Sequence, residues 1–191
     1  MLEKIRSLLL KIAYPFNVWA GKVHLPYTIK QTWHIDNTQL SKGLAYRQPG
    51  LVYLSQTRGS FTNLLIPGEW THAAIMGPDG QIIEAVGAGV IETDPAKFVL
   101  SKDRVVILAP KSSLAVMKSA GGKAKQQLGL KYDYSFKGGN KSFYCAELVG
   151  YSFFVSGFDF TPREMLGEKT YTAQDFYNAK NKFEVLWDSG F

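Results

Sequence analysis

The single cysteine of this sequence, Cys145, is the residue best suited to covalent chemistry. The segment from Ser142 onward predicts a helix capped by the Ser142 side chain, with Cys145 in the first turn. Free N–H groups and the positive end of the helix dipole lie there, and both lower the pKa of a thiol. A lone cysteine among aromatic and aliphatic neighbours is about as often a small buried apolar residue. Cys145 is therefore a candidate nucleophile that still needs a base.

The candidate base is His72, which lies in a predicted strand at residues 71–76. Ala73 and Ala74 follow it and leave room for another element to approach closely. A structural histidine is seldom packed in that way. A histidine base beside Cys145 would favour a thiol nucleophile over a packing residue.

Glu84 interrupts an otherwise apolar strand predicted at residues 81–86. If the preceding turn is a three-residue loop with Gly80 in the left-handed conformation, Ala74 faces Glu84. His72 is then one diagonal away on the same face, at about 7 to 8 Å between backbone carbons, within reach of a hydrogen bond. A two-residue loop would place Glu84 on the opposite face.

Short apolar segments separated by turn residues surround these positions and predict a small, mostly antiparallel sheet packed against helices. The predicted strands lie at 50–54, 71–76, 81–86, 104–108 and 183–187. Helices are predicted at 111–129, where Gly121 and Gly122 weaken the pattern, and after Thr172, which Asp175 helps to cap. The aperiodic segment 59–70 predicts an ordered loop near a site, and 87–89 predicts a turn before 90–92.

Three segments of the chain together resemble a known family. In chain order they are Thr71-His72-Ala73-Ala74-Ile75, Ile83-Glu84-Ala85 and Tyr144-Cys145-Ala146-Glu147-Leu148. They resemble the permuted NlpC-type papain-like cysteine hydrolases, in particular the YiiX-like group, and the resemblance covers about residues 48 to 188. It implies an α+β, circularly permuted papain-like (NlpC-type) fold, in which the histidine strand precedes the cysteine helix.

The resemblance also implies a catalytic triad: Cys145 as the nucleophile, His72 as its base and Glu84 as the group that orients the base. The sequence departs from the family pattern in two places, with Leu51 where the family often has aspartate and Ala146 where it often has serine. Neither departure removes a member of the triad, although the polar site contact that the family's aspartate implies is not expected of Leu51.

Three tyrosines are candidates for substrate or oxyanion contacts. Tyr132 and Tyr134 look like the family's aromatic segment ahead of the cysteine helix, and the hydroxyl of either is a candidate oxyanion donor beside the Cys145 backbone N–H. Tyr144 precedes the nucleophile and is a third candidate contact. Buried aromatic residues are core by default, which is the competing interpretation. Glu147 points away from Cys145 on a helix, so a cap or salt bridge is expected of it rather than catalysis.

These residues predict a cysteine hydrolase that cleaves an amide bond, peptide or aminoacyl, through a thioester acyl-enzyme. Two alternatives stay open. One is a lipid-ester hydrolase or acyltransferase of the lecithin retinol acyltransferase type, and the other is a noncatalytic module that binds a ligand in the same groove. No cofactor is expected, and one cysteine with three histidines offers no recognised zinc-ligand spacing.

The N-terminal quarter of the chain is basic, since residues 1–50 carry seven Lys or Arg against two Asp or Glu. We expect residues 1–47 to be a basic leader, packed on or appended to a catalytic domain at 48–191. An apolar stripe predicts an amphipathic helix within it, formed by Leu2, Ile5, Leu9, Ile12 and Phe16. That stripe either packs on the core or contacts an anionic membrane or envelope surface, and nucleic acid is not an expected partner. With no clear signal peptide and no spanning segment, a cytoplasmic or peripheral membrane location is expected.

Overall fold

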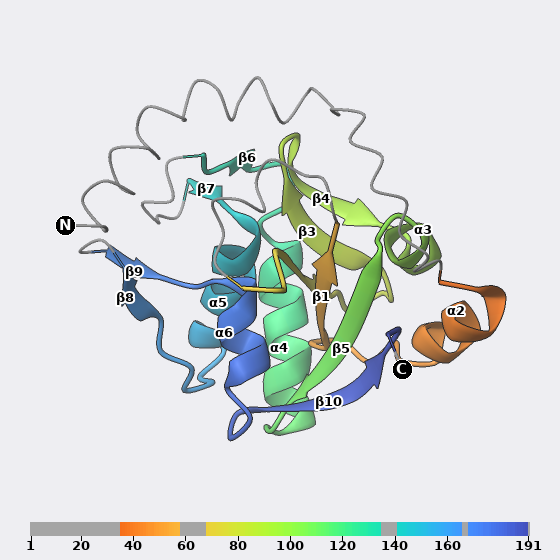
Figure 1. The fold of residues 1–191 in the computed structure, drawn as a ribbon. Helices are drawn as coiled ribbons and strands as arrows, with labels where there is room; N and C mark the ends of the chain where they lie inside the picture. The colour runs from red at the N-terminus through yellow and green to blue at the C-terminus, as the bar shows by residue number, and fades with distance from the viewer. Residues whose placement is uncertain (1–34, 58–67, 135–140, 166–167, 191) are drawn as a thin grey trace.

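A six-stranded antiparallel sheet lies at the centre of the computed structural model (Figure 1), which describes residues 35–57, 68–134, 141–165 and 168–190. The predicted amphipathic helix and most of the predicted loop at 59–70 lie outside the described residues. The strand order is β10-β5-β1-β2-β3-β4, and all neighbouring pairs are antiparallel. The strands are β1 (Val52–Gln56), β2 (His72–Met76), β3 (Ile82–Val86), β4 (Gly89–Thr93), β5 (Arg104–Pro110) and β10 (Phe183–Asp188).

Helices cover both faces of this sheet (Figure 1). They are α2 (Asn37–Leu44), α3 (Pro95–Leu100), α4 (Leu114–Lys125), α5 (Cys145–Phe154) and α6 (Ala173–Asn178). Two small two-stranded sheets complete the described structure. One is parallel, β6 (Lys131–Tyr132) with β7 (Ser142–Phe143), and the other is antiparallel, β8 (Arg163–Met165) with β9 (Glu168–Thr170). The predicted α+β class and mostly antiparallel sheet are confirmed.

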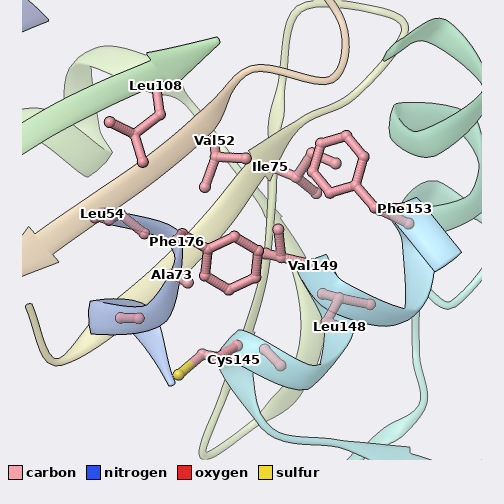
Figure 2. Packing of buried hydrophobic residues seen from close by; sticks show 14 of the residues in the cluster. Val52, Leu54, Ala73, Ile75, Leu108, Cys145, Leu148, Val149, Phe153 and Phe176 are labelled. Atoms are coloured by element: carbon pink, nitrogen blue, oxygen red, sulfur yellow. The ribbon is translucent and has the colours of Figure 1, made fainter. Parts of the chain in front are cut away.

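The sheet separates two hydrophobic cores because successive strand residues point to opposite faces. Val52 and Leu54 belong to the core beneath α4, α5 and α6, whereas Leu51 and Tyr53 belong to the core beneath α2 and α3. Figure 2 shows the first core, in which side chains of α5 and α6 pack against the strands. Both cores are closed to solvent, so β1 is apolar at consecutive positions and not only at alternate ones.

The end of the predicted leader, where α2 lies, packs on the core. α2 packs against α3 and β10, and Gly43 lies so close to the Trp187 ring that an added Cβ would be 2.9 Å from it. Residues 37–44 therefore contribute to the second core. In the part of the chain that the structure describes, no helix combines the length and the apolar character needed to cross a membrane.

The predicted helix at 111–129 is shorter in the structure, where α4 begins after its N-cap Ser113 and ends at Lys125. The two adjacent glycines lie inside this helix but in different surroundings. A Cβ added to Gly121 would lie 2.6 Å from the Met76 carbonyl oxygen, whereas one added to Gly122 would have no heavy atom within 4 Å. Gly121 is therefore required for close approach of α4 to β2, and Gly122 is not.

This difference predicts opposite effects of two neighbouring substitutions on the free energy of unfolding. Gly121→Ala is expected to destabilise the fold by about 2 kcal/mol, because α4 must move away from the strand backbone. Gly122→Ala is its matched control and is expected to stabilise by up to about 1 kcal/mol through helix propensity. Urea unfolding of both variants measures the difference, and equal effects would contradict the close approach.

Candidate active site

The β2–β3 hairpin has the register that brings His72 and Glu84 to one face. Ala74 pairs with Glu84, and the Gly77 N–H donates to the Gln81 carbonyl oxygen at 2.8 Å. Gly80 has φ of 77°, in the left-handed region that a side chain makes costly. The predicted three-residue loop is therefore confirmed, and the two-residue alternative is excluded.

The Glu84 and His72 side chains meet directly across this hairpin. His72 Nε2 lies 2.8 Å from Glu84 Oε2. The Glu84 side chain is only 6% exposed and that of His72 is 18% exposed. A hydrogen bond of this kind holds the ring in one orientation and one tautomer. It also leaves Nδ1 as the ring nitrogen for another partner.

That other partner is Cys145, whose thiol is hydrogen-bonded to the His72 side chain. Cys145 is the first residue of α5 and lies on the face of the helix that packs against the sheet (Figure 2). The structure thus brings Cys145, His72 and Glu84 into one hydrogen-bonded chain, although 73 residues separate the thiol from the histidine in sequence.

The local structure explains why α5 begins at Cys145 and not earlier. Ser142 and Phe143 form β7, which pairs with β6, so the backbone remains extended as far as Tyr144. The prediction that Ser142 caps the helix is therefore wrong, and Tyr144 is the N-cap residue. The Glu147 carboxylate accepts a hydrogen bond from the Tyr144 N–H at 3.3 Å, which is the capping role expected of Glu147.

The thiol also reaches a gap between two strands of the sheet. β2 and β3 pair only as far as Ala74 and Glu84. Because alternate N–H groups of β2 point toward β3, starting from Gly77, the Ala73 N–H points into the gap where that pairing ends. This N–H donates a hydrogen bond to Cys145. The small side chain of Ala73 permits the approach, which is the close contact that the sequence predicted at this position.

The electrostatics of the hydrogen-bonded side chains favour a Cys145 thiolate and a His72 imidazolium. Burial opposes ionisation of the Cys145 thiol, but hydrogen bonds from His72 and from the Ala73 and Ala146 N–H groups outweigh it and lower the thiol pKa. Burial likewise opposes charging of His72, but its bonds to Cys145 and Glu84 raise the His72 pKa from 6.5 to about 9. These two groups titrate as a pair.

Glu84 is held ionised despite its burial. Desolvation raises the pKa of Glu84, but the hydrogen bonds from His72 and Thr93 outweigh it and lower that pKa from 4.5 to about 2. The Thr93 hydroxyl donates to Glu84 Oε1 at 2.5 Å. Thr93 and the Ala73 N–H were both missed by sequence reasoning. Thr93 could have been found from the turn predicted at 87–89. A two-residue loop there pairs Val86 with Gly89, which places the Thr93 side chain on the same face of the sheet as Glu84.

The three candidate tyrosines occupy different positions. Tyr132 lies within electrostatic range of Cys145, and burial together with the Cys145 charge raises the pKa of the Tyr132 hydroxyl. Tyr134 packs on Tyr132 with ring centroids 4.8 Å apart, and its hydroxyl donates to the Gly87 carbonyl oxygen at 3.1 Å. The Tyr134 hydroxyl is thus committed to a backbone acceptor, whereas it is the Tyr132 hydroxyl whose pKa responds to the Cys145 charge.

Tyr144 is part of the packing that supports α5. It is 3% exposed, its hydroxyl lies 2.6 Å from Thr170 Oγ1, and it accepts a hydrogen bond from the Tyr171 N–H at 3.1 Å. These contacts tie β9 and the segment after it to the start of the cysteine helix. Tyr144 is therefore a buried residue whose hydroxyl connects the start of α5 to β9.

Comparisons with known proteins agree with this architecture. The sequence profile of the permuted papain-like amidase enzymes, the YaeF/YiiX or C92 family, matches residues 46–187. A search of curated protein sequences found no match. The crystal structure of the metalloprotein YiiX from Escherichia coli O157:H7 is similar in fold, with a TM-score of 0.60 and 19% sequence identity, covering 73% of this chain and 97% of that one. The match of the family profile over most of the chain shows that this protein belongs to the permuted papain-like amidase family of YaeF and YiiX.

Proposed function

We propose that this protein hydrolyses an amide bond through a thioester acyl-enzyme, with Cys145 as the nucleophile. The observation that carries the proposal is the hydrogen-bonded chain from Glu84 through His72 to the Cys145 thiol at the start of a helix. Membership of an amidase family supports the class of reaction. The finer assignments of residue and step rest on the geometry.

In the proposed mechanism, the Cys145 thiolate attacks the carbonyl carbon and forms a carbon–sulfur bond. The His72 imidazolium then gives its proton to the leaving amine as the carbon–nitrogen bond breaks. Neutral His72 next accepts a proton from the water that attacks the thioester. The carbon–sulfur bond then breaks, which releases the carboxylic acid and restores the Cys145 thiolate beside the His72 imidazolium. Glu84 keeps the imidazole oriented and stabilises its positive charge throughout.

The negative oxygen of the tetrahedral intermediate needs donors near the thiol. The Cys145 backbone N–H is the first of these in the proposal, because it lies in the first turn of α5, where N–H groups have no acceptor within the helix. Tyr132 is the preferred second donor, because the Tyr134 hydroxyl already donates to Gly87. Tyr144 is assigned the role of positioning α5.

The proposal assigns no step to a metal. YiiX is described as a metalloprotein, but in the described ranges of this chain no group of three or more His, Cys, Asp and Glu side chains is placed to hold a metal ion. We propose a peptide or aminoacyl amide as the substrate, because the chain belongs to an amidase family. Two further predictions depend on the basic leader: contact with an anionic membrane, and the lipid-ester alternative. Most of that leader lies outside the described residues, so both stay predictions.

The proposal is tested without a substrate by the rate at which iodoacetamide alkylates the protein between pH 5 and 9. Because Cys145 is the only cysteine, intact mass reports its alkylation directly. An ordinary thiol with a pKa near 8.5 is only about 0.3% thiolate at pH 6, so the parent is expected to react much faster there. His72→Ala is expected to slow alkylation at pH 6 by about 30-fold, since the lower nucleophilicity of a stabilised thiolate offsets part of the gain.

The matched control is Ser152→Ala, which alters a buried residue of the same helix and leaves His72 in place. Its labelling profile is expected to follow that of the parent. A parent thiol that reacts only as pH approaches 8.5, with no change in His72→Ala, would contradict the proposal and favour the noncatalytic binding module.

A further inference from the structure

Thr93 is the fourth member of the hydrogen-bonded chain, and the sheet places it there. Glu84 pairs with Ile91 across β3 and β4, and Thr93 is two residues beyond Ile91 on the same face. His72 lies on that face of β2. Three adjacent strands thus each contribute one polar side chain to a single line of contacts.

The two oxygens of the Glu84 carboxylate have separate partners. Oε2 lies 2.8 Å from His72 Nε2, and Oε1 accepts the Thr93 hydroxyl proton at 2.5 Å. A carboxylate that is hydrogen-bonded through one oxygen alone can rotate about the Cγ–Cδ bond, whereas hydrogen bonds to both oxygens prevent that rotation. Thr93 therefore fixes which oxygen faces the imidazole.

Thr93 is itself held in place from both sides. It pairs with Ile82 at the end of β4, and the next residue, Asp94, caps α3 by accepting a hydrogen bond from the Lys97 N–H at 3.0 Å. Its branched side chain also has few rotamers in a strand. The hydroxyl is thus presented to Glu84 at little further cost in conformational entropy.

We propose that Thr93 is a positioning residue for catalysis, which orients the Glu84 carboxylate toward His72 and thereby supports the charged state of the Cys145–His72 pair. The inference rests on the proposed function for its catalytic meaning. Three charged or titratable groups surround this line of hydrogen bonds. His72 and the Lys102 ammonium lower the pKa of Glu84, and Cys145 raises the pKa of His72. Lys102 lies over the Phe98 ring and is not in the line of hydrogen bonds that Thr93 completes.

The test compares Thr93→Val, which keeps the shape and loses the hydroxyl, with Thr93→Ser, which keeps the hydroxyl. Thr93→Val is expected to slow iodoacetamide labelling at pH 6 by about tenfold, the usual consequence of losing a hydrogen bond to a buried charge. Thr93→Ser is expected to stay within about twofold of the parent. In a Glu84→Gln background, Thr93→Val is expected to have little further effect, because the residue acts through the carboxylate.

A second measurement does not depend on the thiol. In Cys145→Ala, the His72 ring is titrated by NMR with and without Thr93→Val, and His72→Ala identifies its signals. Thr93→Val is expected to lower the proton affinity of the ring by about tenfold. If iodoacetamide alkylates the parent thiol only near the pKa of an ordinary thiol, the proposed function fails. The His72 titration would still decide whether Thr93 positions Glu84.

Three results would overturn the inference. The first is a Thr93→Val protein with the labelling profile and His72 titration of its parent. The second is a Thr93→Ser protein as impaired as Thr93→Val, which would indicate that packing and not the hydroxyl matters. The third is an undiminished effect of Thr93→Val in the Glu84→Gln background.

Discussion

Replacing Cys145 with alanine is expected to reduce amide hydrolysis by at least about 10⁴-fold. The proposed mechanism has no other nucleophile, since the thiolate forms the bond that splits the reaction into two steps. Hydrolysis of a panel of aminoacyl and peptidyl p-nitroanilides, followed by release of p-nitroaniline, measures the loss.

Cys145→Ser provides a sharper comparison, because it keeps a nucleophilic atom in almost the same volume. Its hydroxyl remains neutral at any pH at which the protein is folded, so it cannot form the ion pair with His72. We expect it to be impaired by at least about 10³-fold. Circular dichroism should show both variants folded, and turnover retained by either variant would contradict the assignment of the nucleophile.

Replacing Glu84 is expected to have the second largest effect. Glu84→Ala should reduce kcat/KM by about 10³- to 10⁴-fold, since loss of the orienting carboxylate costs about 10⁴-fold in a Ser-His-Asp triad. Glu84→Gln keeps the shape and the hydrogen-bonding atoms but removes the charge. Without that charge the His72 pKa should fall from about 9 toward its usual 6.5, so the alkaline limb of the pH profile should move to lower pH.

Glu84 also predicts how stability depends on pH. Its pKa is depressed in the folded protein, so its contribution is fully present above the unfolded value of 4.5 and is lost as pH falls toward about 2. The depression corresponds to roughly 3 kcal/mol. Urea unfolding between pH 5 and 2.5 should show this loss in the parent and much less of it in Glu84→Gln. A pH profile shared by both proteins would contradict the ionised, buried state of Glu84.

Local patterns in the sequence were enough to predict the hairpin that carries two of the three triad candidates. The left-handed glycine at position 80 determines the loop length, and the loop length determines which residues of the two strands share a face. The position of Cys145 in the first turn of a helix was also a local property. The capping residue was not, because pairing with β6 keeps Ser142 extended and moves the cap to Tyr144.

The sequence by itself therefore determined the fold class, the presence of the hairpin that carries His72 and Glu84, and the order of the motifs along the chain, whereas the structure decided between the two loop lengths. Only the tertiary structure decided that Cys145 reaches the gap beside Ala73, that Thr93 completes the line of contacts, and that the Tyr144 hydroxyl at the start of α5 contacts Thr170. Turns and strand faces follow from interactions over a few residues, whereas these contacts depend on how whole elements pack. Packing brings together side chains that are far apart in sequence, and no local pattern records which of them will meet.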